Sequence, residues 1–366
     1  MPSIAPTLNG PLGCGSYTVR LVNDGAPILQ TKRVTTVLWT RRIDEASTAT
    51  VTIPVSGTDL RACCDGVNRI EPLRTEVIID RDGRPVWQGW IMSDIEIQRD
   101  AIIVNAHDIL AWTERRVLNL DHVDVGVDLT DIALGYIADV NSAGDLPFVI
   151  TSSSTGITAD RTVLTTEYQF AWEPLQSLLE SGLDATVIAG HLLLGAETAI
   201  CGTLQLRDTD VDGSPELRMD GAQRATRVIV KGGTNEDGGD QVIAIYPSEP
   251  PDVCFHAADY ILEDEEILDQ NSADAAAEEL YQRLSSSYPY YLGIPEGSGL
   301  NPHAPVDING LIPGAIIQFY SQTLCLDVGM AMRLVGLDVE VTSGVESVRI
   351  VLEPIGDNEV LPDAAA

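Results

Sequence analysis

Hydrophobic and polar residues alternate strictly over a short stretch near the start of the chain, which predicts a β-strand. Between Ser47 and Ile53, threonines alternate with alanine, valine and isoleucine, so the strand has one apolar and one polar face. Further on, EVIIDRDGRPVWQGWI predicts a hairpin that closes at Asp82-Gly83, because Asp-Gly favours a two-residue turn. Strand patterns continue to about Trp112 and indicate a closed or sandwiched antiparallel sheet.

The hydrophobic period then changes to that of helices. Asp128 is a candidate N-cap for a helix whose apolar positions, from Leu129 to Val140, fall on one face. A second helix is expected from Glu173-Pro174 to Gly182, followed by a hairpin over 183–194. This stretch predicts an α/β unit inserted between two β-rich parts of the chain.

Strand patterns return in the last third of the chain. A helix capped by Asn271 or Ser272 interrupts them, and the final two strands are expected to meet at a Ser343-Gly344 turn. We therefore predict a mixed, β-rich α+β fold with two antiparallel β-barrel-like domains, an inserted α/β domain and a helix-bearing insertion. The predicted domains are a β-barrel-like domain at 1–114, the α/β domain at 115–220, and a second β-barrel-like domain at 221–366 with a helix near 272–285.

Length and composition support a protein of two or three domains that folds without covalent staples. The chain has 366 residues, of which 44% are hydrophobic. Its six cysteines are scattered without disulfide or zinc spacing, so we expect reduced, mostly buried thiols. Residues 1–10 lack a signal-peptide pattern and no eighteen apolar residues are consecutive, so neither secretion nor membrane spanning is predicted.

The charge balance is strongly acidic. The formal net charge is -33, from 55 acidic and 22 basic residues, and such a surface repels nucleic-acid phosphates. Lysine occurs only at Lys32 and Lys231. Because molar salt shortens the screening length to roughly 3 Å and suppresses self-repulsion, we favour a high-salt-adapted host, such as a halophilic archaeon. An acidic protein from an ordinary high-GC host is the alternative.

Catalytic signatures are absent from the sequence, so we predict that the protein is not an enzyme and needs no cofactor. There is no HExxH, GxSxG, GxxxxGK or GxGxxG motif. The five histidines are far apart, and only His107-Asp108 and Cys254 with His256 are suggestive neighbours. We interpret His107 as the end of a strand and His256 as an ordinary surface or interface residue.

One acidic segment partly matches a calcium loop. Asp208, Asp210 and Asp212 alternate before Gly213, as in the first half of such a loop, but Met219 occupies the place of the bidentate glutamate. The flanks read as strands, so an acidic hairpin tip is the preferred interpretation and calcium the minor one.

Two further groups of residues have a structural and a functional interpretation. The acidic run from Glu263 to Glu266 is usually a solvated face, but in a ring it would keep DNA from adhering to the wall. The tryptophans are interpreted as core or interface anchors in preference to a carbohydrate platform. They are Trp39, Trp87, Trp90, Trp112 and Trp172.

Four segments resemble the tail hub proteins of long-tailed phages and related archaeal tailed viruses, a family that includes baseplate hubs and the N-terminal regions of Tal-like tail-tip proteins. The segments are Trp39–Pro54, Glu71–Arg116 with RDGRPVWQGW, Arg224–Gly233 with ATRVIVKGG, and Asn301–Pro354 with APVDINGLIPGA. The order of a β domain, an α/β insertion and a helix-bearing β domain is also similar.

The resemblance implies a homotrimer at the tail tip of a virion, synthesised in the host cytoplasm. Two barrel-like domains per chain would form a pseudo-sixfold ring that closes the tail tube and joins the distal tail ring protein to a central fibre or spike. The tape measure protein would end in the lumen, and genome DNA would pass through it without specific binding. Many relatives continue into a cell-wall-degrading domain, which we do not expect here because the sequence stops at Ala366.

Two other functions stay open at this point. A receptor- or glycan-binding tail-tip module would need exposed aromatic residues beside paired carboxylates in one groove. A hydrolase of an extracellular polymer, the less favoured of the two, would need two convergent carboxylates roughly 5 to 10 Å apart.

Overall fold

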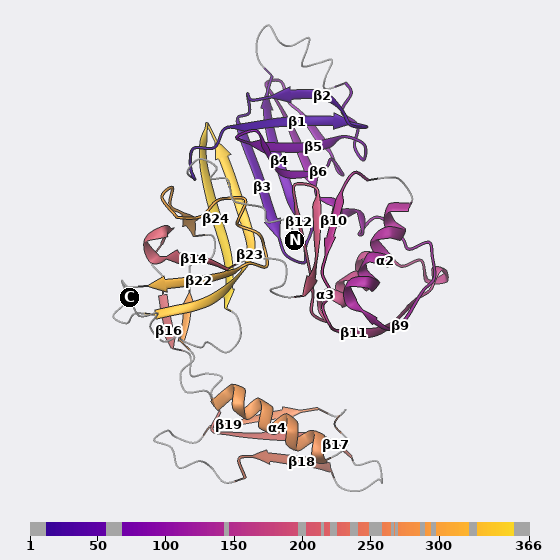
Figure 1. Cartoon of the computed structure of the whole chain (residues 1–366), viewed down its shortest axis with the longest axis vertical. Coiled ribbons are helices and arrows are strands. Elements are labelled where there is room, and N and C mark those ends of the chain that lie inside the picture. The colour runs from indigo at the N-terminus through magenta and orange to yellow at the C-terminus, as the bar shows by residue number, and fades with distance from the viewer. Residues whose placement is uncertain are drawn as a thin grey trace. The chain divides into compact units, whose positions relative to one another are not determined.

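The computed structural model describes two compact units, shown in Figure 1. Unit 1 comprises Met1–Ser214 and Ile294–Glu353, and unit 2 comprises Pro215–Gly293 and Pro354–Ala366. The residues described are 12–55, 68–142, 146–196, 203–213, 216–219, 225–234, 241–248, 258–264, 267, 270–285, 290–293, 298–321 and 328–354. The prediction of a β-rich α+β fold is confirmed. The domain boundaries at residues 114 and 220 stay a prediction.

A 14-stranded sheet dominates unit 1. Its strands are β1 (Tyr17–Asn23), β2 (Ala26–Thr31), β3 (Thr36–Arg42), β4 (Thr48–Pro54), β5 (Glu76–Arg81), β6 (Arg84–Trp90), β7 (Ile95–Ile97), β8 (Ala101–His107), β14 (Thr203–Arg207), β15 (Val211–Asp212), β21 (Gly299–Leu300), β22 (Ile316–Ser321), β23 (Val328–Thr342) and β24 (Val345–Pro354). Their order is β15-β21-β24-β23-β3-β4-β8-β6-β5-β1-β2, with β22 joining β23 to β14 and β7 paired to β8.

The N-terminal and C-terminal strands belong to this one sheet, whereas the sequence suggested two separate barrel-like bodies. The reason is the long strand β23. Its first part, Val328 to Arg333, pairs with β22, and its second part, Gly336 to Thr342, pairs with β3. One strand thereby joins segments almost 300 residues apart, and the described strands do not close into a barrel.

The local signals read from the sequence account for individual strands and turns. Along β4 the alanine, valine and isoleucine are buried and the threonines face outward, as the alternation predicts. Asp82 and Gly83 both have positive φ, 52° and 80°, and connect β5 to β6. Ser343 and Gly344 do the same between β23 and β24, at 53° and 81°. Both predicted turns are confirmed.

The middle of the chain forms the α/β part of unit 1. It contains the 3-10 turns η2 (Ile109–Trp112) and η3 (Thr165–Glu167), the helices α2 (Leu129–Ser142) and α3 (Trp172–Leu179), and the strands β9 (His122–Asp128), β10 (Val149–Ser152), β11 (Thr158–Val163), β12 (Leu183–Ile188) and β13 (His191–Ala196). The strands form a β10-β13-β12 sheet and a β9-β11 ribbon. Both predicted helices are confirmed, although α3 begins at Trp172, one residue before the predicted Glu173-Pro174 start.

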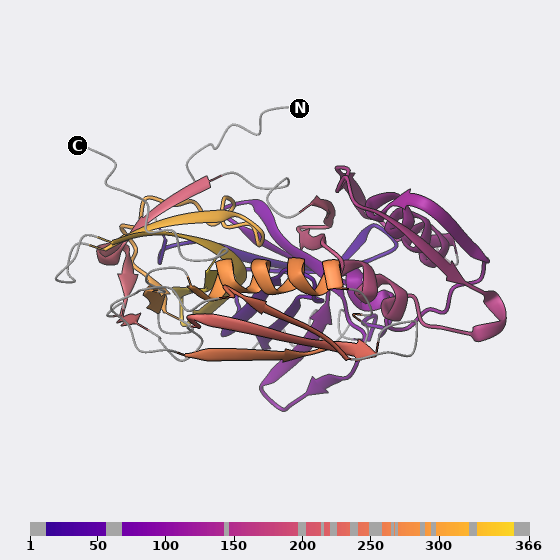
Figure 2. The ribbon, with the colours of Figure 1, turned by 90° about the horizontal axis from the view of Figure 1, so that it is seen from below.

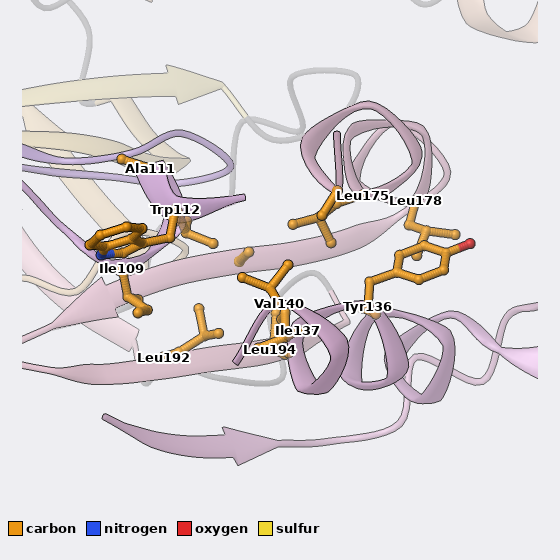
Figure 3. Close-up of a cluster of buried hydrophobic side chains, with 14 of the residues drawn as sticks. Ile109, Ala111, Trp112, Tyr136, Ile137, Val140, Leu175, Leu178, Leu192 and Leu194 are labelled. Atoms are coloured by element: carbon orange, nitrogen blue, oxygen red, sulfur yellow. The ribbon is translucent and has the colours of Figure 1, made fainter. Parts of the chain in front are cut away.

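One apolar core holds this α/β part together, as Figure 3 shows. Helix α2 contributes Tyr136, Ile137 and Val140, and α3 contributes Leu175 and Leu178. Strand β13 adds Leu192 and Leu194, and η2 adds Ile109, Ala111 and Trp112. A cavity of about 10 Å³ lies among these side chains, lined by Ile109, Leu110, Thr113, Ile137, Val140, Asn141, Leu146, Phe148 and Leu192. Burial of the helix stripes against β13 explains why the amphipathic pattern forms helices here.

Unit 2 is a small sheet with one helix. Its elements are β16 (Glu216–Met219), β17 (Arg227–Thr234), β18 (Gln241–Tyr246), β19 (Asp259–Glu263), α4 (Gln270–Ser285) and β20 (Tyr290–Gly293). The central sheet has the order β18-β17-β19, and Figures 1 and 2 show α4 running along these strands. Helix α4 begins at Gln270, slightly before the predicted caps. The side-chain amide of Gln270 donates to the Ile243 carbonyl and to the Asp274 carboxylate, which stabilises this first residue. No helix among the described residues is long and apolar enough to cross a membrane.

Candidate assembly site

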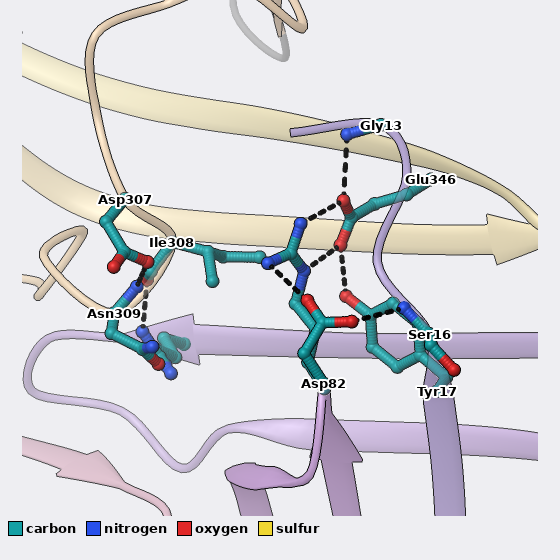
Figure 4. Close-up of polar contacts among 10 residues, drawn as sticks. Gly13, Ser16, Tyr17, Asp82, Asp307, Ile308, Asn309 and Glu346 are labelled. Carbon is teal, nitrogen blue, oxygen red and sulfur yellow. Dashed lines mark hydrogen bonds and ion pairs between the residues drawn. The ribbon is translucent and has the colours of Figure 1, made fainter. Parts of the chain in front are cut away.

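A buried ion pair connects β24 to the neighbouring strands β1 and β5 of unit 1 (Figure 4). Arg81, at the end of β5, donates from Nε and Nη2 to the two carboxylate oxygens of Glu346 in β24, at 2.8 and 2.9 Å. Neither side chain is exposed to solvent. Glu346 also accepts hydrogen bonds from the Tyr17 hydroxyl in β1 and from the Gly13 amide, the latter at 2.8 Å. The pair therefore holds the segment around Gly13 and Tyr17, near the start of the sequence, against β24, near its end.

The electrostatics of this cluster favour a charged Glu346. Burial alone would raise the pKa of Glu346, but the hydrogen bonds from Arg81 and Tyr17 outweigh burial and hold the pKa below its ordinary value. Burial and the adjacent Glu346 charge both raise the pKa of the Tyr17 hydroxyl, so it stays protonated and donates. All the acceptor oxygens of Glu346 are used, which makes a structural role the natural one.

A second buried cation fixes a loop to the same sheet. Arg41 in β3 is fully buried and donates to the carbonyl oxygens of Ile308, Leu311 and Val86 at 2.9, 3.2 and 2.9 Å. Its guanidinium carbon lies 5.0 Å from the ring centroid of Trp39. Burial lowers the pKa of Arg41 to about 10. The loop held here belongs to APVDINGLIPGA, one of the segments that carry the family resemblance.

The α/β part is attached to the large sheet by polar contacts along β12. The Arg333 guanidinium lies 2.5 Å from the Asp184 carboxylate. The Ala185 amide donates to the Asp44 carboxylate at 2.8 Å, and the Asp44 amide donates to the Ala185 carbonyl at 2.7 Å. These contacts hold the insertion in a defined position within unit 1.

The predicted cap of α2 is confirmed. The Asp128 carboxylate accepts hydrogen bonds from the Thr130 amide at 2.9 Å, the Ser154 hydroxyl at 2.7 Å and the Gly156 amide at 2.9 Å. Burial opposes the charged form of Asp128, but these hydrogen bonds outweigh burial and lower its pKa. The cap therefore also fixes the loop that leads into β11.

We expect Asp128→Ala to lower the free energy of unfolding by about 1–2 kcal/mol at neutral pH, as for the loss of a helix cap. Since the folded-state pKa is depressed, this stabilisation is complete above the unfolded-state value of about 4 and is lost as the pH falls below it. The measurement is denaturant unfolding at several pH values. Asp94→Ala, in an exposed loop, is the control and is expected to change stability by less than about 0.5 kcal/mol. A constant difference between wild type and Asp128→Ala down to the lowest pH would contradict the cap.

The three carboxylates of the candidate calcium loop lie on two short elements. Asp208 and Asp210 lie on the short turn η4 (Asp208–Asp210), and Asp212 lies on β15. The Asp208 carboxylate accepts from the Ser321 hydroxyl at 3.1 Å, and the Asp210 carboxylate accepts from the Arg207 amide at 2.8 Å. Within the described ranges, no group of three or more acidic, histidine or cysteine residues is arranged to hold a metal ion. Calcium at this loop stays an untested, minor prediction.

The other residues noted in the sequence occupy ordinary positions. His107 ends β8, as predicted, and burial lowers its pKa. Four tryptophans are buried, and Trp172 packs at the edge of the α/β core, which fits the interpretation as anchors. Glu263 ends β19, whereas His256, Glu265 and Glu266 lie outside the described residues. Cys14 is a free, exposed thiol, and the other five cysteines also lie outside the described residues.

Two exposed apolar surfaces were not distinguished by the sequence. The first, here called the apolar ribbon, follows β9 and β11 and the segments that continue them; its exposed residues are Leu120, Val123, Val125, Leu164, Tyr168 and Phe170. The second, here called the isoleucine face, lies on β17, β18 and β19 and consists of Ile229, Ile243, Ile245 and Ile261. Exposed apolar patches of this kind are typical of surfaces that contact other proteins.

Comparison with solved structures identifies the architecture. The 43 kDa tail protein of prophage MuSo2 from Shewanella oneidensis matches with a TM-score of 0.55 and 14% identity, over 91% of this chain and 97% of that one. A tail protein from Neisseria meningitidis MC58 matches with a TM-score of 0.56 and 14% identity, over 92% and 97% of the two chains. A chain of the Francisella PdpA–VgrG complex matches with a TM-score of 0.52 and 10% identity, over 98% of this chain and 55% of that one.

This chain has the fold of those phage tail proteins. No protein-family model and no curated protein matches the sequence. The likeness extends over nearly the whole length of both tail proteins, and so includes the large sheet, the α/β part and the small helix-bearing unit together. The resemblance stated from four sequence segments therefore agrees with the three-dimensional architecture.

Proposed function

We propose that this chain is a structural protein of a virion, located at the tip of a viral tail, where three copies form a ring. The observation that carries the proposal is the match to two tail proteins over more than nine-tenths of this chain and of each of those two chains. The shared fold extends over both units of the chain, and neither tail protein is described as an enzyme. We accordingly propose a role that is not enzymatic.

In this proposal the ring closes the tail tube and connects the distal tail ring protein to a central fibre or spike. The tape measure protein ends in the lumen, and DNA passes through without specific binding. The net charge of -33 supports the last point, because carboxylates lining the bore repel phosphates. The buried Arg81–Glu346 and Arg41 contacts connect distant segments of the large sheet, which suits a subunit that must keep its shape within a ring.

The mass of the assembly tests this proposal. At micromolar concentration in molar salt, we expect sedimentation to give the mass of three 39.4 kDa chains. If the protein sediments as a single chain at every concentration, the proposed ring is wrong.

Salt dependence tests the proposed high-salt host. With 55 acidic and 22 basic residues, the folded chain repels itself in dilute buffer, and salt screens this repulsion. We expect the melting temperature to rise steadily from dilute to molar potassium chloride. A melting temperature that is constant or falls over this series favours an ordinary, non-halophilic host.

A receptor- or glycan-binding tail-tip module is the second candidate function. It is favoured by Tyr168, whose side chain is 76% exposed, beside the exposed Phe170 on the apolar ribbon. Aromatic faces of this kind can stack on sugars. Retention of the purified chain on immobilised host-surface polysaccharide, abolished by Tyr168→Ala, would distinguish this function from a purely structural one.

A further inference from the structure

The isoleucine face of unit 2 lies on the side of the β17–β18–β19 sheet that faces away from α4. Cross-strand partners lie on the same side of a sheet, and Ile229 is paired with both Ile245 and Ile261. Ile243 lies in the next row, opposite Lys231. Ile243, Ile245 and Ile261 are 48%, 45% and 51% exposed, although isoleucine is among the residues most often buried in proteins.

The opposite side of this sheet is covered by α4, but the core formed there is small. Its fully buried members are four alanines and three valines: Ala225, Val228, Val230, Val242, Ala244, Ala273 and Ala277. Partly buried residues pack against these, among them Tyr246, Leu262, Leu280 and Leu284. Three strands on one helix are close to the minimum for an independently stable unit, so burial of the isoleucine face against a neighbour would add stability.

Charged residues at the edge of the isoleucine face are already neutralised within the chain. Arg227 donates to both oxygens of Asp259 at 2.8 and 2.6 Å, and the Lys231 ammonium lies 2.9 Å from the Glu263 carboxylate. Lys231 is one of only two lysines in the sequence. Two neutralised pairs beside each other are notable on a chain with a net charge of -33, because among the described residues of this face they give another acidic molecule no unpaired carboxylate to repel it.

The apolar ribbon differs in this respect. Its Asp121 and Asp160 accept hydrogen bonds from Thr165 and from the Gly126 amide, but neither forms an ion pair with a lysine or arginine in the described part of the chain. Neither carboxylate is therefore neutralised by a direct ion pair in the way that Asp259 and Glu263 are. Of the two exposed apolar surfaces, the isoleucine face is the one suited to a highly acidic partner.

We propose that the isoleucine face is a contact between copies of this chain, covered by a neighbouring copy in the assembly. The inference rests on the proposed homotrimer and identifies one of its interfaces. In a threefold ring each contact joins two different surfaces, so the isoleucine face packs on another part of the neighbouring chain. The flat apolar centre with an ion-paired rim matches the anatomy of a protein interface, with an apolar core and a polar rim.

The test compares the full-length wild type with two double variants by sedimentation in molar salt. Ile245→Asn/Ile261→Asn is expected to weaken the assembly by about tenfold or more, because polar groups replace apolar anchors at the centre of the contact. Ile245→Val/Ile261→Val keeps the surface apolar and is expected to assemble normally. Circular dichroism of the asparagine variant checks that unit 2 still folds.

Two further variants sharpen the result. Val125→Asn changes the apolar ribbon, where the side chain is 75% exposed, and is expected to leave assembly unchanged.

Arg227→Gln leaves Asp259 without its cation, so assembly should weaken in dilute buffer and recover in molar salt. If the wild type assembles and the folded asparagine variant assembles equally well, this inference is wrong and the proposed homotrimer stands. A wild type that stays monomeric would overturn the proposed homotrimer instead.

Discussion

Replacing Glu346 by glutamine is expected to lower the free energy of unfolding of unit 1 by about 3 kcal/mol, the lower end of the range for breaking a buried ion pair. The substitution removes the fully buried, doubly hydrogen-bonded counterion of Arg81 and leaves the Asp82 carboxylate, 3.2 Å away, as a partner that is partly exposed. Glutamine keeps an oxygen that can accept from Gly13 or Tyr17, so the substitution isolates the effect of the charge. Denaturant unfolding followed by tryptophan fluorescence measures this unit selectively. All five tryptophans lie between Trp39 and Trp172, within unit 1.

Glu340→Gln is the matched control. Glu340 and Arg349 form an ion pair in the same hairpin, but the side chains are about half exposed and 3.7 Å apart. We expect a change of less than about 0.5 kcal/mol. The double variant Arg81→Met/Glu346→Gln removes both charges and is expected to be more stable than Glu346→Gln alone. Equal losses for Glu346→Gln and Glu340→Gln would show that the buried pair contributes nothing beyond a surface pair.

Leu192→Ala is expected to cost about 3–5 kcal/mol, in the upper part of the range for buried leucines. The side chain is 1% exposed in the core shown in Figure 3 and already lines a cavity of about 10 Å³. Truncation enlarges this space, and the surrounding α2 and β13 residues are held by the rest of the core. The same fluorescence measurement applies, because Trp112 lies in this core.

Val125→Ala is the control for this core variant. It removes apolar volume from the exposed ribbon and is expected to change stability by less than about 0.5 kcal/mol. A Leu192→Ala variant as stable as the control would mean that β13 is not packed against α2 and η2 as described.

Much of the local structure could be predicted from the sequence, because it depends on neighbours in the chain. The alternation in β4, the Asp82-Gly83 turn and the Asp128 cap each involve residues only a few positions apart. The pairing of β3 with β23 could not be predicted, since strand periodicity identifies a strand and its faces but not its partner. For this reason the sequence did not reveal that strands of the two predicted barrel-like domains join in one sheet.

The candidate site shows the same limit. Arg81 and Glu346 are 265 positions apart, and nothing in their local sequence marks either one as buried. The isoleucines of β17, β18 and β19 follow the same alternation as core strands, so the pattern alone could not tell which side α4 covers. The acidic composition, by contrast, is evident from the sequence. The sequence does not show which carboxylates are neutralised, and the structure shows that Asp259 and Glu263 are paired with basic residues.

We propose above that copies of this chain form a closed ring at a tail tip. Electron micrographs of the purified chain, at micromolar concentration in molar salt, test it most directly. We expect uniform threefold rings, each built from three chains around a central opening. Fields of separate single chains, or open filaments without closure, would contradict it.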